Sequence, residues 1–385
     1  MQTSRPGSNL DGYRSLFDPQ YIPAVLVGRE KERNFLKGFL LDNYAVKSEH
    51  GSSENLGTSV MLNGLHGVGK ATLVRKVLQD LCKDCTDESP LKVANIWINC
   101  SEKDESQLLH DIMTKLAIEP DQARDEKMDI SSAWSMISSF LRKAARRSAF
   151  NLFFINVECM SLQSFNKLAA NLKNLGLNLL MTTSMRHNNY FIDNLDLAID
   201  LDVYNISDLH EIVDHRARVA FPEIESDVSR FITDAVVEFD SPRPGPCINV
   251  LKYLYPHLHS RNLDTVSLDM VQESVKNALP GISYNELELA EFFANASIEK
   301  MIFLDNVVGF HETSGRFYIS KTELHDLFMT SCESMEIEPR TGEFDEILAD
   351  MMASNIFMKS NQTPGNFFTM IPSRLVKSYI DVMFN

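Results

Sequence analysis

The segment from Gly64 to Lys70 has the residue types and spacing of a phosphate-binding loop. It fits the pattern Gly-x-x-x-x-Gly-Lys between a predicted strand and a predicted helix. Glycines let successive backbone N–H groups turn towards phosphate oxygens, and the N-terminus of the following helix adds partial positive charge. We therefore expect ATP or ADP to bind here, with Lys70 reaching the terminal phosphates. The predicted binding residues are Gly64, Leu65, His66, Gly67, Val68, Gly69, Lys70, Ala71 and Thr72.

The residue after the lysine decides whether a metal can bind. Magnesium-nucleotide sites place a Ser or Thr hydroxyl there. This chain has Ala71, and Thr72 follows one residue late, about 100° further round a helix. Phosphate binding survives this change, but we expect Mg²⁺ coordination to be weak or absent.

A second element of such sites is an acidic pair that ends a later strand. The apolar run 152–155 is followed by Asn156, Val157 and Glu158. Asp is expected where Asn156 stands and Glu where Val157 stands. Asn156 carries no charge, and Glu158 is displaced by one residue and is interpreted as a solvated loop carboxylate. Together with Ala71, this degenerate motif predicts impaired hydrolysis, and no catalytic residue is assigned.

The elements that must position these residues follow from the hydrophobic pattern. Short apolar runs alternate with helical patterns, which predicts an α/β domain with a parallel sheet covered on both faces. Strands are expected over 59–62, 93–98, 152–155, 177–182 and 197–203. Helices are expected over 30–43, 69–83, 105–117, 131–148 and 161–175.

The remaining chain divides into further regions. We expect a flexible lead over 1–24, a nucleotide-binding core over 25–205, a helical lid over 206–280 and a winged helix over 281–385. Breaks in the lid are expected at Phe221-Pro222 and at 241–246. The winged helix is predicted from helices over 286–304, 320–335 and 343–354, followed by a hairpin of strands 356–359 and 367–370.

Composition limits the classes of function. The chain has 385 residues, 37 Lys and Arg, 53 Asp and Glu, and a net charge of −16, which argues against a freestanding nucleic-acid binder. No apolar run is long enough for a membrane span, so no membrane partner is expected. Six cysteines in a chain of this length indicate a reduced, cytosolic or nuclear setting.

The order of these motifs resembles the initiator AAA+ proteins, the origin recognition complex subunits and their helicase-loading relatives. Gly28-Arg29-Glu30 precedes the phosphate loop, and the degenerate acidic strand, lid and winged helix follow. Ile96 to Cys100 resembles the second strand of the family, and Tyr204, Leu209, Ile212 and Arg216 resemble the segment that enters the lid. The resemblance covers roughly residues 22–385, and outside the phosphate loop it is only moderately specific.

The resemblance implies an ATP-binding subunit that assembles with other origin recognition complex subunits in the nucleus. Double-stranded DNA would be contacted mainly as part of the complex, and a helicase loader or helicase indirectly. The polar first sensor of the family falls at Thr183 or Ser184. No Arg or Lys lies between Tyr190 and Asp202, where the family has its arginine finger. The second sensor would align near Ile248, but the nearby arginine is Arg243. These departures resemble a degenerate fourth- or fifth-type subunit.

Two other interpretations stay open. A signal-transduction P-loop ATPase also combines a Gly-Arg-Glu entry, a lid and a winged helix, and a P-loop scaffold without nucleotide is the simplest alternative. Two further signals are weak: the pair Cys82 and Cys85, and a basic cluster that suits DNA, an acidic partner or solvent. The cluster comprises Arg142, Lys143, Arg146 and Arg147.

The predicted winged helix is acidic. Residues 281–385 contain sixteen Asp and Glu against seven Lys and Arg, a balance of −9. The helix over 343–350, which would enter a major groove, carries four carboxylates where DNA presents phosphates. We therefore expect this domain to contact a protein neighbour, with Phe344, Ile347, Leu348 and Met351 packing in its own core.

Overall fold

The computed structural model describes residues 15–18, 20–50, 57–84, 92–118, 129–144, 148–184, 195–221, 224–261, 266–279 and 286–384. The chain forms two compact units. One comprises residues 20–203, and the other comprises residues 204–385 together with residues 1–19. The predicted boundary between core and lid, after residue 205, lies close to this division.

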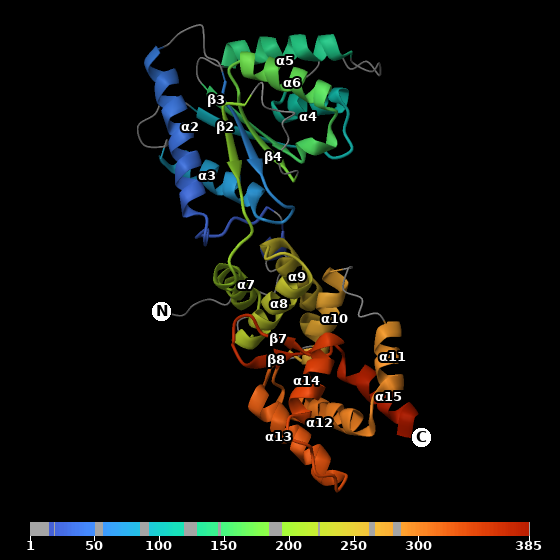
Figure 1. Ribbon diagram of the computed structural model, residues 1–385. Coiled ribbons are helices and arrows are strands. Elements are labelled where there is room, and N and C mark those ends of the chain that lie inside the picture. Colours follow the sequence, from blue (N-terminus) through green and yellow to red (C-terminus); the bar gives the residue numbers. More distant parts are fainter. Residues whose placement is uncertain are drawn as a thin grey trace. The chain divides into compact units, whose positions relative to one another are not determined.

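The first unit is built on a five-stranded parallel sheet with the strand order β2-β3-β4-β1-β5 (Figure 1). The strands are β1 (Ser59–Asn63), β2 (Lys92–Asn99), β3 (Ser148–Ile155), β4 (Asn178–Thr183) and β5 (Leu197–Asp200). All five strands were predicted, and the α/β fold class is confirmed. Because the strands are parallel, their carboxyl ends share one edge, where ligands of such sheets bind.

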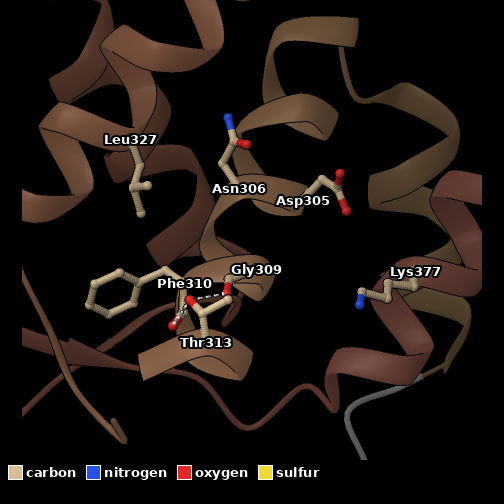
Figure 2. A pocket seen from close by; sticks show the side chains of 7 residues that line it. All are labelled: Asp305, Asn306, Gly309, Phe310, Thr313, Leu327 and Lys377. Carbon is tan, nitrogen blue, oxygen red and sulfur yellow. Dashed lines mark hydrogen bonds between the residues drawn. The ribbon is translucent and has the colours of Figure 1, made fainter. Parts of the chain in front are cut away.

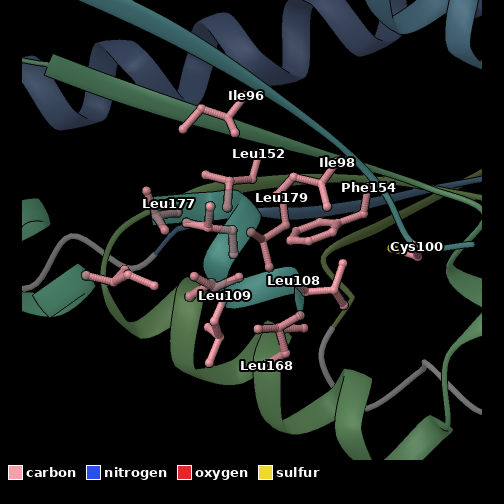
Figure 3. Close-up of a cluster of buried hydrophobic side chains, with 14 of the residues drawn as sticks. Ile96, Ile98, Cys100, Leu108, Leu109, Leu152, Phe154, Leu168, Leu177 and Leu179 are labelled. Carbon is pink, nitrogen blue, oxygen red and sulfur yellow. The ribbon is translucent and has the colours of Figure 1, made fainter. Parts of the chain in front are cut away.

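Helices cover both faces of this sheet. They are α2 (Glu30–His50), α3 (Lys70–Asp84), α4 (Glu105–Lys115), α5 (Ile130–Ala144) and α6 (Leu162–Asn174). The last three pack on one face around alternate strand residues such as Ile96, Leu152 and Phe154 (Figure 3). The opposite face receives α2, where the Tyr44 hydroxyl donates to Asn151 Oδ1 at 2.7 Å. Side chains of β3 point alternately to the two faces of the sheet, so one face is apolar and the other contains the buried polar side chain of Asn151.

The second unit begins with four helices, α7 (Ile206–Ala220), α8 (Ser226–Phe239), α9 (Pro244–Arg261) and α10 (Leu268–Ala278). The predicted break over 241–246 ends earlier, because Pro244 is the first residue of α9. Proline suits this position, since the first N–H of a helix has no partner within the helix. Part of the predicted flexible lead also belongs here. Leu16 and Phe17 are buried, and the Phe17 ring packs against Phe221 and Tyr255.

The C-terminal part has the helix-and-hairpin outline expected of a winged helix. Its helices are α11 (Glu286–Asn295), α12 (Ile298–Ser314), α13 (Lys321–Ser334), α14 (Glu343–Ala353) and α15 (Ser373–Phe384). Its antiparallel sheet has the order β6-β8-β7, from β6 (Ile319–Ser320), β7 (Met358–Lys359) and β8 (Asn366–Phe368). The predicted core residues of α14 are confirmed as buried: Phe344, Ile347, Leu348 and Met351.

Three details of this part differ from the prediction. The helix expected over 286–304 is interrupted, because the Ser297 side chain accepts from the Lys300 N–H and caps a new helix, α12. The strand β6 and the helix α15 were not predicted. None of the described helices is long and apolar enough to cross a bilayer.

Candidate nucleotide-binding site

The predicted site residues gather at the carboxyl edge of the parallel sheet. The loop from Gly64 to Lys70 follows β1, whereas Asn156 and Glu158 follow β3. Thr183 ends β4 and pairs in register with Asn63, the residue just before the loop. Residues predicted from separate motifs thus lie on neighbouring strand ends.

The loop has the backbone conformation that its glycines allow. Gly64, Gly67 and Gly69 have φ values of 149°, 81° and 96°, which side chains disfavour. A Cβ at Gly64 would lie 2.7 Å from the Leu201 carbonyl oxygen, so no other residue fits there. The helix α3 begins at Lys70, and its N-terminal amides therefore face the loop.

Lys70 reaches back over this loop. Its Nζ donates to the Gly64 carbonyl at 2.6 Å and to the Leu65 carbonyl at 2.9 Å. The ammonium group is thus held inside the arc formed by the backbone. Buried Val68 anchors the turn, and His66 stays exposed. This donor set, of backbone amides, a helix N-terminus and an ammonium, suits phosphate oxygens.

The same site has few side chains that could act as ligands to a metal ion. Ala71 and Thr72 occupy the first turn of α3, and only Thr72 carries a hydroxyl, one position past the expected one. In the part of the chain that the structure describes, no three His, Cys, Asp or Glu side chains are grouped as an all-protein metal site would need. Mg²⁺ beside a nucleotide, however, takes most of its ligands from water and phosphates. The residues therefore fit a nucleotide phosphate, and weak or absent Mg²⁺ coordination stays a prediction from Ala71.

Asn156 is fixed by neighbours that need its amide hydrogens. Its Nδ2 donates to Ser101 Oγ at 3.1 Å and to Asn99 Oδ1 at 3.5 Å. Its backbone N–H donates to Thr182 Oγ1 at 3.3 Å, and its φ of 58° is left-handed. A carboxylate could not donate to Asn99, so the surroundings match a neutral amide at this position.

Glu158 is not a solvated loop carboxylate, and that interpretation was wrong. The 3-10 turn η2 (Val157–Cys159) directs its side chain to the end of β4. There Oε1 accepts from the Ser184 N–H at 3.0 Å and from the Ser184 hydroxyl. Oε2 is buried without a hydrogen bond. The displaced carboxylate therefore links the β3 loop to the first-sensor zone at Ser184.

Several residues at this edge were not assigned to the site from the sequence. Asn63 Nδ2 donates to Asp200 Oδ1 at 2.8 Å, which joins the ends of β1 and β5. Asn99 and Ser101 hold Asn156, as described above. Each of these residues lies at or just beyond the end of an apolar run, and that position is the signal that could have revealed them.

Arg29 of the Gly-Arg-Glu entry is buried beside the chain that leaves β5. Its guanidinium donates to the Asp202 carbonyl and pairs with Glu32 at 3.3 Å. Residues 195–202 contain no Arg or Lys, and 190–194 lie outside the described residues. Arg243, in the second unit, pairs with Asp240 just before α9. Thus neither of the two arginines that the resemblance implies is present at its expected position among the described residues.

The structure adds little support for a metal site at the cysteine pair or for a function of the basic cluster. Cys82 Sγ accepts from Asn95 Nδ2 at 3.6 Å, and Cys85 lies outside the described residues. Arg142 and Lys143 are exposed at the end of α5, whereas Arg146 and Arg147 are not described.

Comparison with known proteins supports the fold. No protein-family model matches the sequence, and no curated protein matches it. Cdc6p from Pyrobaculum aerophilum superposes with a TM-score of 0.71 at 20% identity, covering 96% of this chain and 97% of that one. The Aeropyrum pernix ORC2 protein, solved as ADPNP-ADP complexes, gives 0.56 at 18% identity, covering 96% and 97%. A chain of Drosophila ORC bound to DNA gives 0.53 at 15% identity, covering 99% and 95%. Over nearly its whole length, this chain therefore has the AAA+ fold of Cdc6 and ORC proteins.

Proposed function

We propose that this chain is an ATP-binding subunit of a DNA replication origin recognition complex that hydrolyses ATP extremely slowly. Its phosphate cradle is complete, with Lys70 directed into the loop, while Ala71 and Asn156 stand where metal-binding groups are needed. This combination in an initiator-like fold is the observation that carries the proposal.

The remaining parts of the proposal follow from the likeness to Cdc6 and ORC structures. The chain assembles in the nucleus with other AAA+ subunits around origin DNA, which it contacts mainly as part of the complex. A helicase loader and helicase are indirect partners. Nucleotide serves as a structural element of assembly, held by Lys70 and completed by a neighbouring subunit, because this chain has no arginine of its own at 195–202.

Calorimetric titration with ADP and ATP, each with Mg²⁺ or with a chelator, tests the site. We expect wild-type affinity to be nearly independent of Mg²⁺ and Lys70→Ala to lose binding. Ala71→Ser restores the hydroxyl after the lysine and should make affinity depend on Mg²⁺. Since removing one transition-state contact can cost about 10²–10³ in rate, turnover should be near background. Steady turnover of about 1 s⁻¹ that Lys70→Ala abolishes contradicts the proposal.

Assembly is tested separately by affinity purification of the full chain followed by mass spectrometry. We expect other initiator subunits to co-purify, in smaller amounts with Lys70→Ala than with wild type. Recovery of signalling receptors instead would favour a signal-transduction P-loop ATPase. Normal assembly of Lys70→Ala, with the same affinity in the absence of nucleotide, would identify the cradle as vestigial.

A further inference from the structure

An open groove crosses the C-terminal part of the second unit between α12, α13 and α15. Figure 2 shows its lining side chains, which come mainly from one stripe of α12, with Leu327 from α13 and Lys377 from α15. The hollow has a volume of about 610 Å³, which is room for several side chains rather than one ion. It is therefore large enough to receive part of another chain.

The floor of the groove is a glycine on a helix. Gly309 lies in the middle of the α12 stripe, and a Cβ built there meets no atom within 4 Å. Glycine is unfavourable inside a helix by roughly 0.5–1 kcal/mol relative to alanine. Nothing in the fold of the domain requires a glycine at this position. Its effect is to leave the surface of α12 open between Phe310 and Asp305.

The walls combine apolar and acidic groups. Phe310 and Leu327 are half-buried at the edge of the domain core, and the Arg316 guanidinium lies over the Phe310 ring, 5.3 Å from its centroid. Asp305, Glu312 and Asp381 surround Lys377, and these carboxylates raise the pKa of its ammonium group, with the Glu312 hydrogen bond as the largest cause. The lining itself carries one acidic residue, Asp305, and one basic residue, Lys377. The negative balance comes from Glu312 and Asp381, which act on Lys377 from outside the lining.

Some polar groups of the groove already have a hydrogen-bond or ion-pair partner within the domain, and others do not. Asn306 Nδ2 donates to Ser331 Oγ at 2.8 Å, and the Thr313 hydroxyl donates to the Gly309 carbonyl at 2.7 Å. Lys377 is paired with Glu312. The exposed carboxylate of Asp305 has no hydrogen bond or ion pair within the described part of the chain. Its oxygens can therefore accept hydrogen bonds from a cationic ligand, although its charge also acts on Lys377.

We propose that this groove is the docking site for a short basic segment of a protein partner, with an apolar side chain seated over Gly309 and an Arg or Lys beside Asp305. An apolar anchor next to a charge-complementary rim is a recurrent mode of peptide recognition. DNA is the disfavoured occupant, because the −9 balance of residues 281–385 opposes phosphates. Such a segment would belong to the protein neighbour expected for this domain, and its binding is independent of nucleotide binding at Lys70.

The test uses the full chain and a library of random peptides of roughly ten residues, a length that spans such a groove. Peptides selected on the wild type are measured against Gly309→Leu, which fills the groove, and Asp305→Lys, which reverses its free charge. Gly38→Leu is the matched control, because Gly38 lies on a helix of the other unit and also has no atom within 4 Å of an added Cβ. Thermal unfolding verifies that each variant is folded.

We expect selected peptides to carry Lys or Arg close to Leu, Phe or Met. Their affinity should fall about ten-fold or more with Gly309→Leu and with Asp305→Lys, and stay unchanged with Gly38→Leu and Lys70→Ala. Peptides that bind Gly309→Leu as well as wild type, or that are acidic, overturn the inference. A Gly309→Leu-sensitive interaction with duplex DNA overturns it as well. Failure of the wild type to bind nucleotide, by contrast, bears only on the proposed function.

Discussion

The Tyr318 hydroxyl donates a 2.9 Å hydrogen bond to Oδ2 of Asp234, although the sequence assigned these residues to different domains. Asp234 is completely buried on α8, where it also accepts from the Ser360 hydroxyl at 2.6 Å and the Asn361 N–H at 3.1 Å. This carboxylate therefore joins the helical lid to the sheet of the C-terminal domain. The two predicted domains lie in one compact unit, and this carboxylate is one of the contacts between them.

Asp234→Asn should weaken this junction. An amide can still accept from Tyr318 and Ser360 through its oxygen, but its NH₂ group then faces the N–H of Asn361. A buried donor without an acceptor costs about 1–3 kcal/mol, so we expect the free energy of unfolding to fall by that amount. Urea denaturation of the full chain measures the change. A loss smaller than that caused by Tyr318→Phe would show that Asp234 does not organise the junction.

We expect Glu323 to make the free energy of unfolding depend on pH in the acidic range. The Arg316 guanidinium, with the N–H and hydroxyl of Ser320, lowers the pKa of this carboxyl from 4.5 to about 2. A lowered folded pKa means that the stabilisation is complete above the unfolded pKa and is lost as the pH falls from about 4.5 towards 2. Glu323→Gln keeps the capping-box geometry without the charge. We expect its unfolding free energy to decline less than that of wild type over this pH range, and parallel declines would contradict the assignment.

We expect substitution of Glu158 to lower the stability of the protein without changing its ATP turnover. Because Oε1 binds both Ser184 groups, Glu158→Ala leaves a half-buried N–H and a hydroxyl without their acceptor. This should cost about 0.5–1.5 kcal/mol of stability. We expect the residual ATP turnover to be unchanged, since the carboxylate faces Ser184 and not an attacking water. A single-turnover assay beside thermal unfolding measures both. Loss of turnover in a Glu158→Gln variant of unchanged stability would make the carboxylate a catalytic group.

The parts predicted from the sequence were those set by local signals. The strands were recognisable as short apolar runs, and the phosphate loop was recognisable because its glycines and lysine are consecutive. The helix α15 was missed although Val376 and Ile380 have helical spacing and are buried, because so short a pattern at the chain end is weak. The two-residue strand β6 has too few residues to show any period.

Contacts between distant residues could not be predicted in this way. Glu158 lies 26 positions from Ser184, and Asp234 lies 126 positions from Ser360. Neither pair follows from periodicity, since the orientation of one side chain depends on where another element packs. The residue types gave no warning either, because a lone Glu in a loop is usually solvated. Such links became visible only when the elements were placed in space.

We expect that the position of Gly57, just before β1, does not tolerate a side chain. Its N–H donates to the Lys173 carbonyl at 2.9 Å, and a Cβ would lie 1.8 Å from the Leu177 carbonyl oxygen. Since backbone cannot move aside as a flexible side chain can, Gly57→Ala should destabilise the first unit by about 1–3 kcal/mol or more. Gly38→Ala, on open α2, should instead stabilise it by about 0.5–1 kcal/mol. Chemical denaturation compares the two, and equal effects would show that the close approach at Gly57 is relaxed.

The charges of α14 predict weak DNA binding by the C-terminal domain. Three of its carboxylates are paired with basic residues of the same domain. Asp345 pairs with Lys321 at 2.8 Å, Glu343 with Arg340 at 3.4 Å, and Asp350 with Lys300. Counterion release by such cations dominates DNA affinity, and here they are already neutralised within the domain.

We therefore expect Lys359→Glu in the wing to leave the affinity of the full chain for duplex DNA unchanged at about 0.15 M salt. Asp345→Lys combined with Glu346→Lys removes two exposed negative charges and frees Lys321, so this variant should bind DNA about ten-fold more tightly or better. Fluorescence anisotropy with a labelled duplex measures both. Micromolar binding by wild type that Lys359→Glu weakens would place DNA on this domain, and the acidic face of α14 would then not exclude it.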